Sequence, residues 1–367
     1  MNVQLKINYA MKRTIFLITM IASIVFAGCK SNKSNQIELG AIIPLTGYSA
    51  SNGILFQRGL ELAVEELNLD STDISFNVNL EDSKSSPKDA LMAYRKLESK
   101  GVKYFLGFGG QFVLGFVAET NNSDKALFIS AAPNKNMLSL SNRILRIFPN
   151  IEMVTDKVRD FVISNNYMNV AIIYAQNEAY AMYYESALKK LQEAGRNVVF
   201  IESYDPNCRD FKNIINKLSK QKVDVIYSAG VGESSALLTK QLYGNSTTTN
   251  IPIIGDMNFS SPDNLAVIGD IKSPVYSIDS YLDTSFINKY KEKYNQTPNT
   301  YAVYGYIIPY LIREALSHLG KEASADNVYE YIMKNAFSTA AGNISFNPDT
   351  KEPVLDLVFN SATNNNQ

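Results

Sequence analysis

The stretch IELGAIIPLTGYSASNGILFQRGLELAVEELN, residues 37–68, places an apolar run, a polar turn and a helical pattern in succession. The run over residues 37–45 predicts a buried strand. The pattern that follows has apolar residues on one helical face, namely Leu60, Ala63, Val64 and Leu67. A strand, a turn and a helix in this order are the opening of a parallel-sheet unit.

The same alternation continues along the chain. Further strands are expected at residues 73–82, 102–107, 126–130, 169–175, 197–203, 223–230 and 251–256, and the segment 273–283 then leads into the last helical stretch. Helices are expected at 85–101, after the glycine-rich turn at 107–112, at 178–195, 210–221 and 234–244, and twice within 286–316. A short strand pair, 342–348 and 354–360, closes the chain. Strands separated by helices of this length favour two doubly wound lobes with parallel sheets.

The composition excludes several functions. The chain has 367 residues, 46% hydrophobic, 19% charged and a formal net charge of −1, which suits a globular protein of two domains and argues against a nucleic-acid partner. The one histidine, His318, lies near the end of a helical pattern, so a histidine-based triad or multi-histidine metal site is excluded. No clustered nucleophile, base and orienting group is visible, so we expect a non-catalytic protein without a cofactor.

The N-terminus reads as an export signal. Lys12 and Arg13 precede an apolar core of 13 residues, 15–27, too short to span a bilayer comfortably, and Met11 is an alternative start to Met1. Residues 27–29, Ala-Gly-Cys, resemble the lipobox of bacterial lipoproteins, although Phe26 departs from its usual aliphatic residue. The resemblance implies acylation of Cys29, a membrane anchor and a polar tether, with plain secretion as the alternative. Cys208, in a polar loop, is expected to be a bystander.

The turn GFGGQF, residues 107–112, can approach a ligand closely. It is not a dinucleotide fingerprint, because Phe112 stands where the third glycine belongs, and no Walker lysine follows. Two more segments of the same lobe supply polar loops at strand ends, at residues 40–53 and 129–136. Each alone is explained equally well by turn chemistry and helix capping. Together they predict a ligand site beyond the carboxyl ends of the strands.

These segments resemble type I periplasmic binding proteins, especially the leucine/isoleucine/valine-binding branch. The resemblance rests on the opening stretch, on EDSKSSPKDALMAYRKLESKGVKYFLG (81–107), ALFISAAPN (126–134), NVAIIYAQNEAYAMYYESALKKLQEAG (169–195) and on residues 286–316. It implies an α/β fold with two doubly wound lobes, a three-strand hinge and a ligand cleft between the lobes. The expected division is a signal peptide (1–28), a tether (29–36), lobe 1 (37–148 and 279–341), lobe 2 (149–278 and 342–362) and a tail (363–367).

The resemblance also implies a set of ligand-binding residues. They are Asn52, Gly110, Gln111, Ala132, Asn134, Tyr180, Glu233 and Asp256. Gln111 and Asn134 stand where amino-acid-binding members have a serine and a threonine for the α-carboxylate. Tyr180 matches an aromatic lid or is ordinary helix surface or core, and Glu233 is explained equally well as a helix cap. Asp256 is the expected ammonium or polar anchor, whereas Glu81 and Asp82 are expected to support the loop leading to Ser86.

The implied function is capture of a small polar molecule by hinge closure and its delivery to an ABC importer. A branched-chain amino acid, an amide, a short peptide, a modified amino acid or a small aromatic acid remains open as the ligand. The implied partners are a permease and an ATPase, with the chain itself a monomer anchored in the cell envelope of a bacterium. The alternative is a receptor of the same fold that senses a ligand and signals through a membrane partner without transport.

Overall fold

The computed structural model describes residues 36–362 apart from 48, 71–72, 109–118, 120–125, 133–136, 142, 231, 258 and 260. The predicted Cys29, Gly110, Gln111 and Asn134 therefore lie outside the described residues. Residues 37–367 form a single compact unit by their internal contacts. No helix within the described residues is long and apolar enough to cross a membrane.

The first sheet has five strands in the order β2-β1-β3-β4-β5, of which β1, β3, β4 and β5 pair in parallel. Its strands are β1 (Gln36–Ile43), β2 (Ser75–Asp82), β3 (Tyr104–Phe108), β4 (Leu127–Ala131) and β5 (Ile144–Arg146). The helices between them are α2 (Ala50–Leu69), α3 (Pro87–Glu98) and the short α5 (Met137–Leu140). Every residue of β3, β4 and β5 is buried, as expected for parallel strands covered on both faces.

Helix α3 begins at the residues that the sequence predicts for its N-terminus. Ser86 accepts a hydrogen bond from the Asp89 amide as N-cap, and Pro87 occupies the first turn. The loop that leads there is held by Asp82, whose carboxylate accepts the Lys84 amide of this loop at 2.8 Å and the Leu45 amide of the loop after β1 at 2.9 Å. Asp82 thus supports this loop, as expected.

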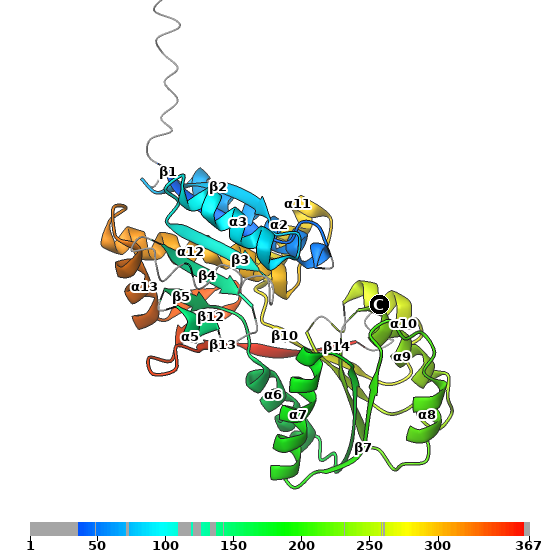
Figure 1. Cartoon of the computed structure of the whole chain (residues 1–367). Coiled ribbons are helices and arrows are strands. Elements are labelled where there is room, and N and C mark those ends of the chain that lie inside the picture. The colour runs from blue at the N-terminus through cyan, green and yellow to red at the C-terminus, as the bar shows by residue number, and fades with distance from the viewer. Residues whose placement is uncertain are drawn as a thin grey trace, which may run out of the picture. The chain divides into compact units, whose positions relative to one another are not determined.

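Helix α12 (Thr300–Leu319) returns to the first sheet and lies along α2 (Figure 1). Two glycines allow this approach. A Cβ added to Gly59 would collide with the carbonyl of Ala302, and one added to Gly305 would collide with the carbonyl of Phe56. The two helices are therefore packed backbone to backbone.

The second sheet has six strands in the order β14-β10-β9-β8-β6-β7, all parallel except β14. Its strands are β6 (Asn169–Ala175), β7 (Asn197–Tyr204), β8 (Val225–Ala229), β9 (Ile253–Gly255), β10 (Val275–Ser280) and β14 (Leu357–Ala362). Helices α6 (Ile151–Ser164) and α7 (Glu178–Glu193) cover one face. The other face carries α8 (Lys212–Leu218), α9 (Glu233–Tyr243) and α10 (Pro262–Ile268) (Figure 1).

The chain passes between the two sheets three times: from β5 to α6, from β10 to α11 (Thr284–Tyr294), and from β13 to β14. Before the last passage, α13 (Ala325–Lys334) leads into a small antiparallel sheet of β11 (Phe337–Thr339), β12 (Gly342–Phe346) and β13 (Pro353–Leu355). The predicted strand 354–360 is thus divided at Asp356 between two sheets. The residue boundaries expected for the lobes stay a prediction.

Candidate functional site

Asp256 directly follows β9, at the carboxyl end of the second sheet. Its side chain is buried, and its Oδ1 accepts a hydrogen bond from the hydroxyl of Tyr227 on β8 at 2.7 Å. The other oxygen, Oδ2, is buried without a hydrogen-bond partner among the described residues. A buried carboxylate oxygen that lacks a donor is costly, so this oxygen is placed to receive one from a ligand.

Burial raises the pKa of Asp256 to about 7, although the Tyr227 hydroxyl and the Gly230 amide act in the opposite direction. Among the described residues, no lysine or arginine offsets the desolvation of this carboxylate. A pKa shifted this far by burial at the carboxyl end of a parallel sheet is typical of functional sites.

Tyrosines surround Asp256. Tyr227 is fully buried, and Tyr204 at the end of β7 is buried with its hydroxyl 2.8 Å from Ser235 Oγ. Tyr180 and Tyr183, one turn apart on α7, have ring centroids 6.1 Å apart. Burial and the nearby Asp256 carboxylate raise the pKa of Tyr180, Tyr183, Tyr204 and Tyr227, so all four tyrosines stay neutral hydroxyls at physiological pH.

Tyr301, in the first turn of α12, extends this cluster to the first sheet. Tyr301 raises the pKa of both Tyr180 and Tyr183 and therefore lies near them. Its ring packs on Phe108 with centroids 4.8 Å apart and on Phe148 with centroids 5.9 Å apart. Because Phe108 ends β3, the cluster reaches the start of the glycine-rich turn that the sequence singles out. We call Asp256, Tyr180, Tyr183, Tyr227 and Tyr301 the Asp256 cluster.

The remaining described candidates lie as follows. Asn52 is half-buried in the first turn of α2, and Ala132 is buried just after β4. Glu233 opens α9 with an exposed side chain and forms an ion pair with Arg209. No described contact joins these three residues to the Asp256 cluster. Tyr180, in contrast, lies near enough to Asp256 for that carboxylate to raise the pKa of the tyrosine.

Sequence reasoning missed Tyr183, Tyr227 and Tyr301. Tyr183 follows Tyr180 by three residues and so shares its helical face, a signal that was readable. Tyr227 lies inside an apolar strand and looks like ordinary core. Tyr301 lies 121 positions after Tyr180, as their residue numbers show, and only the tertiary structure brings them together.

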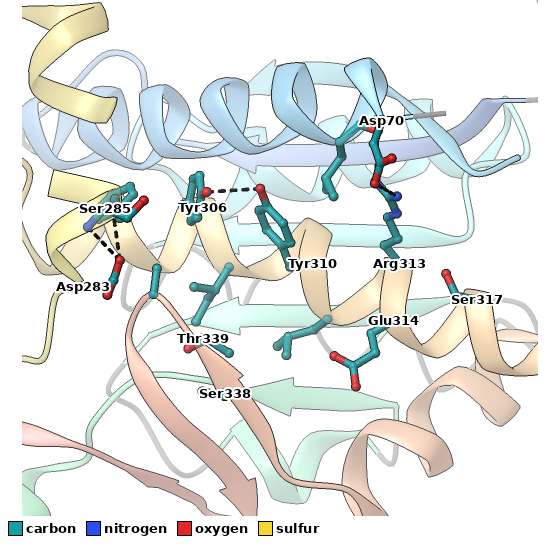
Figure 2. Close-up of a pocket in the computed structure, with 15 residues that line it drawn as sticks. Asp70, Asp283, Ser285, Tyr306, Tyr310, Arg313, Glu314, Ser317, Ser338 and Thr339 are labelled. Carbon is teal, nitrogen blue, oxygen red and sulfur yellow. Dashed lines mark hydrogen bonds and ion pairs between the residues drawn. The ribbon is translucent and has the colours of Figure 1, made fainter. Parts of the chain in front are cut away.

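A groove of 580 Å³ runs along α12 (Figure 2), and none of its lining residues belongs to the Asp256 cluster. Its polar groups are largely engaged with one another: Arg313 pairs with Asp70 at 2.6 Å, and the Tyr306 and Tyr310 hydroxyls lie 3.1 Å apart. Glu66 on α2 accepts hydrogen bonds from both tyrosines, at 2.8 and 2.9 Å. These contacts attach α12 to α2. Among the described residues, no group of three or more histidine, cysteine or acidic side chains is arranged to hold a metal ion.

The family model described as periplasmic binding protein matches residues 36–366, so the chain belongs to the periplasmic binding protein family. It is a type I member that resembles the Leu/Ile/Val-binding proteins. Leu/Ile/Val-binding protein homolog 1 of Brucella abortus is 23% identical over 350 residues, which cover 92% of each chain.

Solved structures confirm the fold with two lobes. A solute-binding protein of an ABC transporter from Rhodopseudomonas palustris, in complex with 3,4-dihydroxybenzoic acid, superposes with a TM-score of 0.77 at 20% identity and covers 89% of this chain and 93% of its own. The branched-chain amino acid transporter substrate-binding protein LivJ of Streptococcus pneumoniae, in complex with isoleucine, gives 0.76 at 20% identity, with 90% and 97% covered. Such relatives are solute-binding proteins rather than enzymes.

Proposed function

We propose that this protein captures a small molecule that carries a protonated amine, and that the amine binds the free oxygen of Asp256. The observation that carries the proposal is Asp256 Oδ2, which is buried and lacks a hydrogen-bond partner among the described residues. An ammonium group supplies both the missing donor and the missing positive charge.

The tyrosines around Asp256 define the rest of the ligand's environment. Aromatic faces attract cations and also pack against apolar groups, so the Asp256 cluster suits an amine with an aliphatic or aromatic body. Tyr180 and Tyr183 come from the second lobe and Tyr301 from the helix packed on the first. A ligand between them would draw the lobes together, which is how a binding protein reports occupancy.

The structural relatives bind isoleucine in one case and 3,4-dihydroxybenzoic acid in another. Asp256 favours the first class, because an ionised carboxylate repels a second carboxylate brought close to it in a medium of low dielectric constant. Above a pH of about 7, where Asp256 is ionised, an amino acid or related amine is therefore the better ligand. Gln111 and Asn134 are our candidates for the amino acid's carboxylate.

The ligand would be delivered to an ABC importer whose permease and ATPase are separate proteins. We infer that Cys29 is acylated and holds the exported receptor at a membrane surface, with the polar residues 30–36 as a tether. The receptor itself would then need no enzymatic activity.

Thermal unfolding of residues 30–367 with 1 mM of each compound in a panel tests this proposal. The panel holds aliphatic and aromatic amino acids, their amides, dipeptides, simple amines, and the corresponding acids without an amino group. A ligand with a micromolar dissociation constant stabilises the folded protein by about 4 kcal/mol, well within detection. Stabilisation only by amine-bearing compounds is expected, and stabilisation only by aromatic acids would contradict the proposal.

A further inference from the structure

Arg146, the last residue of β5, is the largest fully buried side chain of the described residues. Its Nη1 donates a hydrogen bond to the carbonyl of Phe148, and its Nη2 forms an ion pair with Glu352. Burial lowers the pKa of Arg146 only to about 10, so the guanidinium remains charged. Such a buried charge depends on nearby carboxylates. Glu352 forms the ion pair with Arg146, and the charge of Glu152 also raises the pKa of Arg146.

Glu352 also forms a hydrogen bond with a second residue, Asn150. Its carboxylate accepts a hydrogen bond from the Asn150 side-chain amide at 3.0 Å, across 202 positions of sequence. Asn150 is the N-cap of α6, where its own oxygen accepts the Met153 amide at 2.8 Å. One carboxylate therefore binds both ends of the passage from β5 to α6, which is one of the three connections between the sheets.

We propose that Arg146, Glu352 and Asn150 form a clamp on this connection that stabilises the assembled Asp256 cluster, and that these positioning residues set ligand affinity without touching the ligand. Lobe movement requires backbone rotation in the few residues of each connection. Rotation within residues 147–149 changes the separation of Arg146 and Asn150, which Glu352 holds fixed. This inference rests on the proposed function.

The clamp also adjoins the site. The charge of Arg146 lowers the pKa of both Tyr183 and Tyr304, which places the guanidinium near each of these two tyrosines. Tyr183 belongs to the Asp256 cluster, and the hydroxyl of Tyr304 lies 2.7 Å from Ser280 Oγ, at the end of β10 and thus at a second connection. The clamp is made in the same conformation that gathers the tyrosines of α7 and Tyr301 around Asp256. Its loss should favour conformations in which they are apart.

Two substitutions test the clamp. Asn150→Ser keeps a side-chain cap for α6 but removes the amide that reaches Glu352, and it leaves the Arg146 ion pair in place. Glu352→Gln keeps an acceptor but removes its charge. The first measurement uses no ligand: small-angle scattering of residues 30–367, which contain the whole compact unit. The second is titration with L-phenylalanine and L-isoleucine, with dissociation rates from stopped flow.

Both variants should show a larger radius of gyration than the parent protein. At least one amino acid should bind about fivefold more weakly, through a faster dissociation rate, as expected for loss of a charge-assisted hydrogen bond. Glu330→Gln is the matched control: it breaks the exposed pair of Glu330 with Lys334 on α13 and should change neither quantity. Thermal unfolding confirms that every variant is folded.

The outcomes separate the two proposals. A larger radius of gyration with no binding of either amino acid to the parent protein would support the clamp and count against the amino-acid receptor. An unchanged radius in Asn150→Ser and Glu352→Gln would overturn the clamp, whether or not affinity changes. A changed radius with affinity equal to that of the parent would overturn the claim that the clamp sets affinity.

Discussion

Replacing Asp256 by asparagine should stabilise the empty protein while it weakens ligand binding. Burial raises the pKa of Asp256 from 3.8 to about 7. A carboxyl whose pKa is raised on folding stabilises the folded state relative to the unfolded state at low pH, and this contribution is lost as the pH rises through the folded-state value. At pH 8 the shift of about three units corresponds to a penalty of about 4 kcal/mol.

Asparagine removes that penalty and can still accept the hydrogen bond from Tyr227. Its amide nitrogen then takes the place of Oδ2. If this nitrogen has no hydrogen-bond partner, it lowers the free energy of unfolding by about 1–3 kcal/mol. We therefore expect Asp256→Asn to raise the free energy of unfolding by about 2 kcal/mol at pH 8 and to lower it at pH 4, near the unfolded-state pKa of 3.8. Urea unfolding at the two pH values measures this change of sign.

For an amine-bearing ligand the same substitution removes a desolvated ionic partner. Loss of this ionic partner should weaken the binding free energy by about 3 kcal/mol, which raises the dissociation constant on the order of a hundredfold. In the parent protein the dissociation constant should rise about tenfold from pH 8 to pH 6, because Asp256 becomes protonated below its pKa. In Asp256→Asn this pH dependence should vanish. Equal affinity in both proteins at pH 8, measured by calorimetry, would refute this account of the site.

Three further substitutions test separate parts of the structure. Tyr227→Phe removes the hydroxyl that donates to Asp256, so the midpoint of the pH dependence of ligand affinity should move up by about one unit; an unmoved midpoint would show that this hydrogen bond is unimportant. Gly59→Ala places a methyl group against a carbonyl of α12 and should lower the free energy of unfolding by about 1–3 kcal/mol, whereas Gly244→Ala, with only ordinary contacts, should cost less than about 1 kcal/mol. Cys29→Ser should release the protein from the membrane fraction or leave its signal uncleaved, and unchanged fractionation with unchanged mature mass would exclude lipidation.

The sequence predicts the order of strands and helices well, because each buried parallel strand is a short apolar run bounded by turn residues. Ser86 and Pro87 even predict where α3 starts. It fails at residues 354–360, which look like one strand. The structure divides them at Asp356, whose carbonyl accepts the Tyr281 amide and whose carboxylate accepts the Asn343 amide. These partners are distant in sequence, so no local pattern reveals them.

The sequence predicts a site residue only where an ionisable side chain directly follows a predicted strand. Asp256 qualifies because it directly follows a buried strand, at the carboxyl end of a parallel sheet, where ligands bind in this class of fold. Tyr227 and Arg146 do not, since a tyrosine or arginine inside a strand pattern can equally be core or surface. What distinguishes them is a partner from elsewhere in the chain, Asp256 in one case and Glu352 in the other.

The central claim is that the site selects a protonated amine. Calorimetric titration at pH 8 of L-phenylalanine and its counterpart without the amino group, 3-phenylpropionate, together with the equivalent leucine pair, tests it most directly. The account predicts that at least one amino acid binds and that its deaminated counterpart binds on the order of a hundredfold more weakly. Equal or tighter binding of the deaminated acid would contradict the role assigned to Asp256.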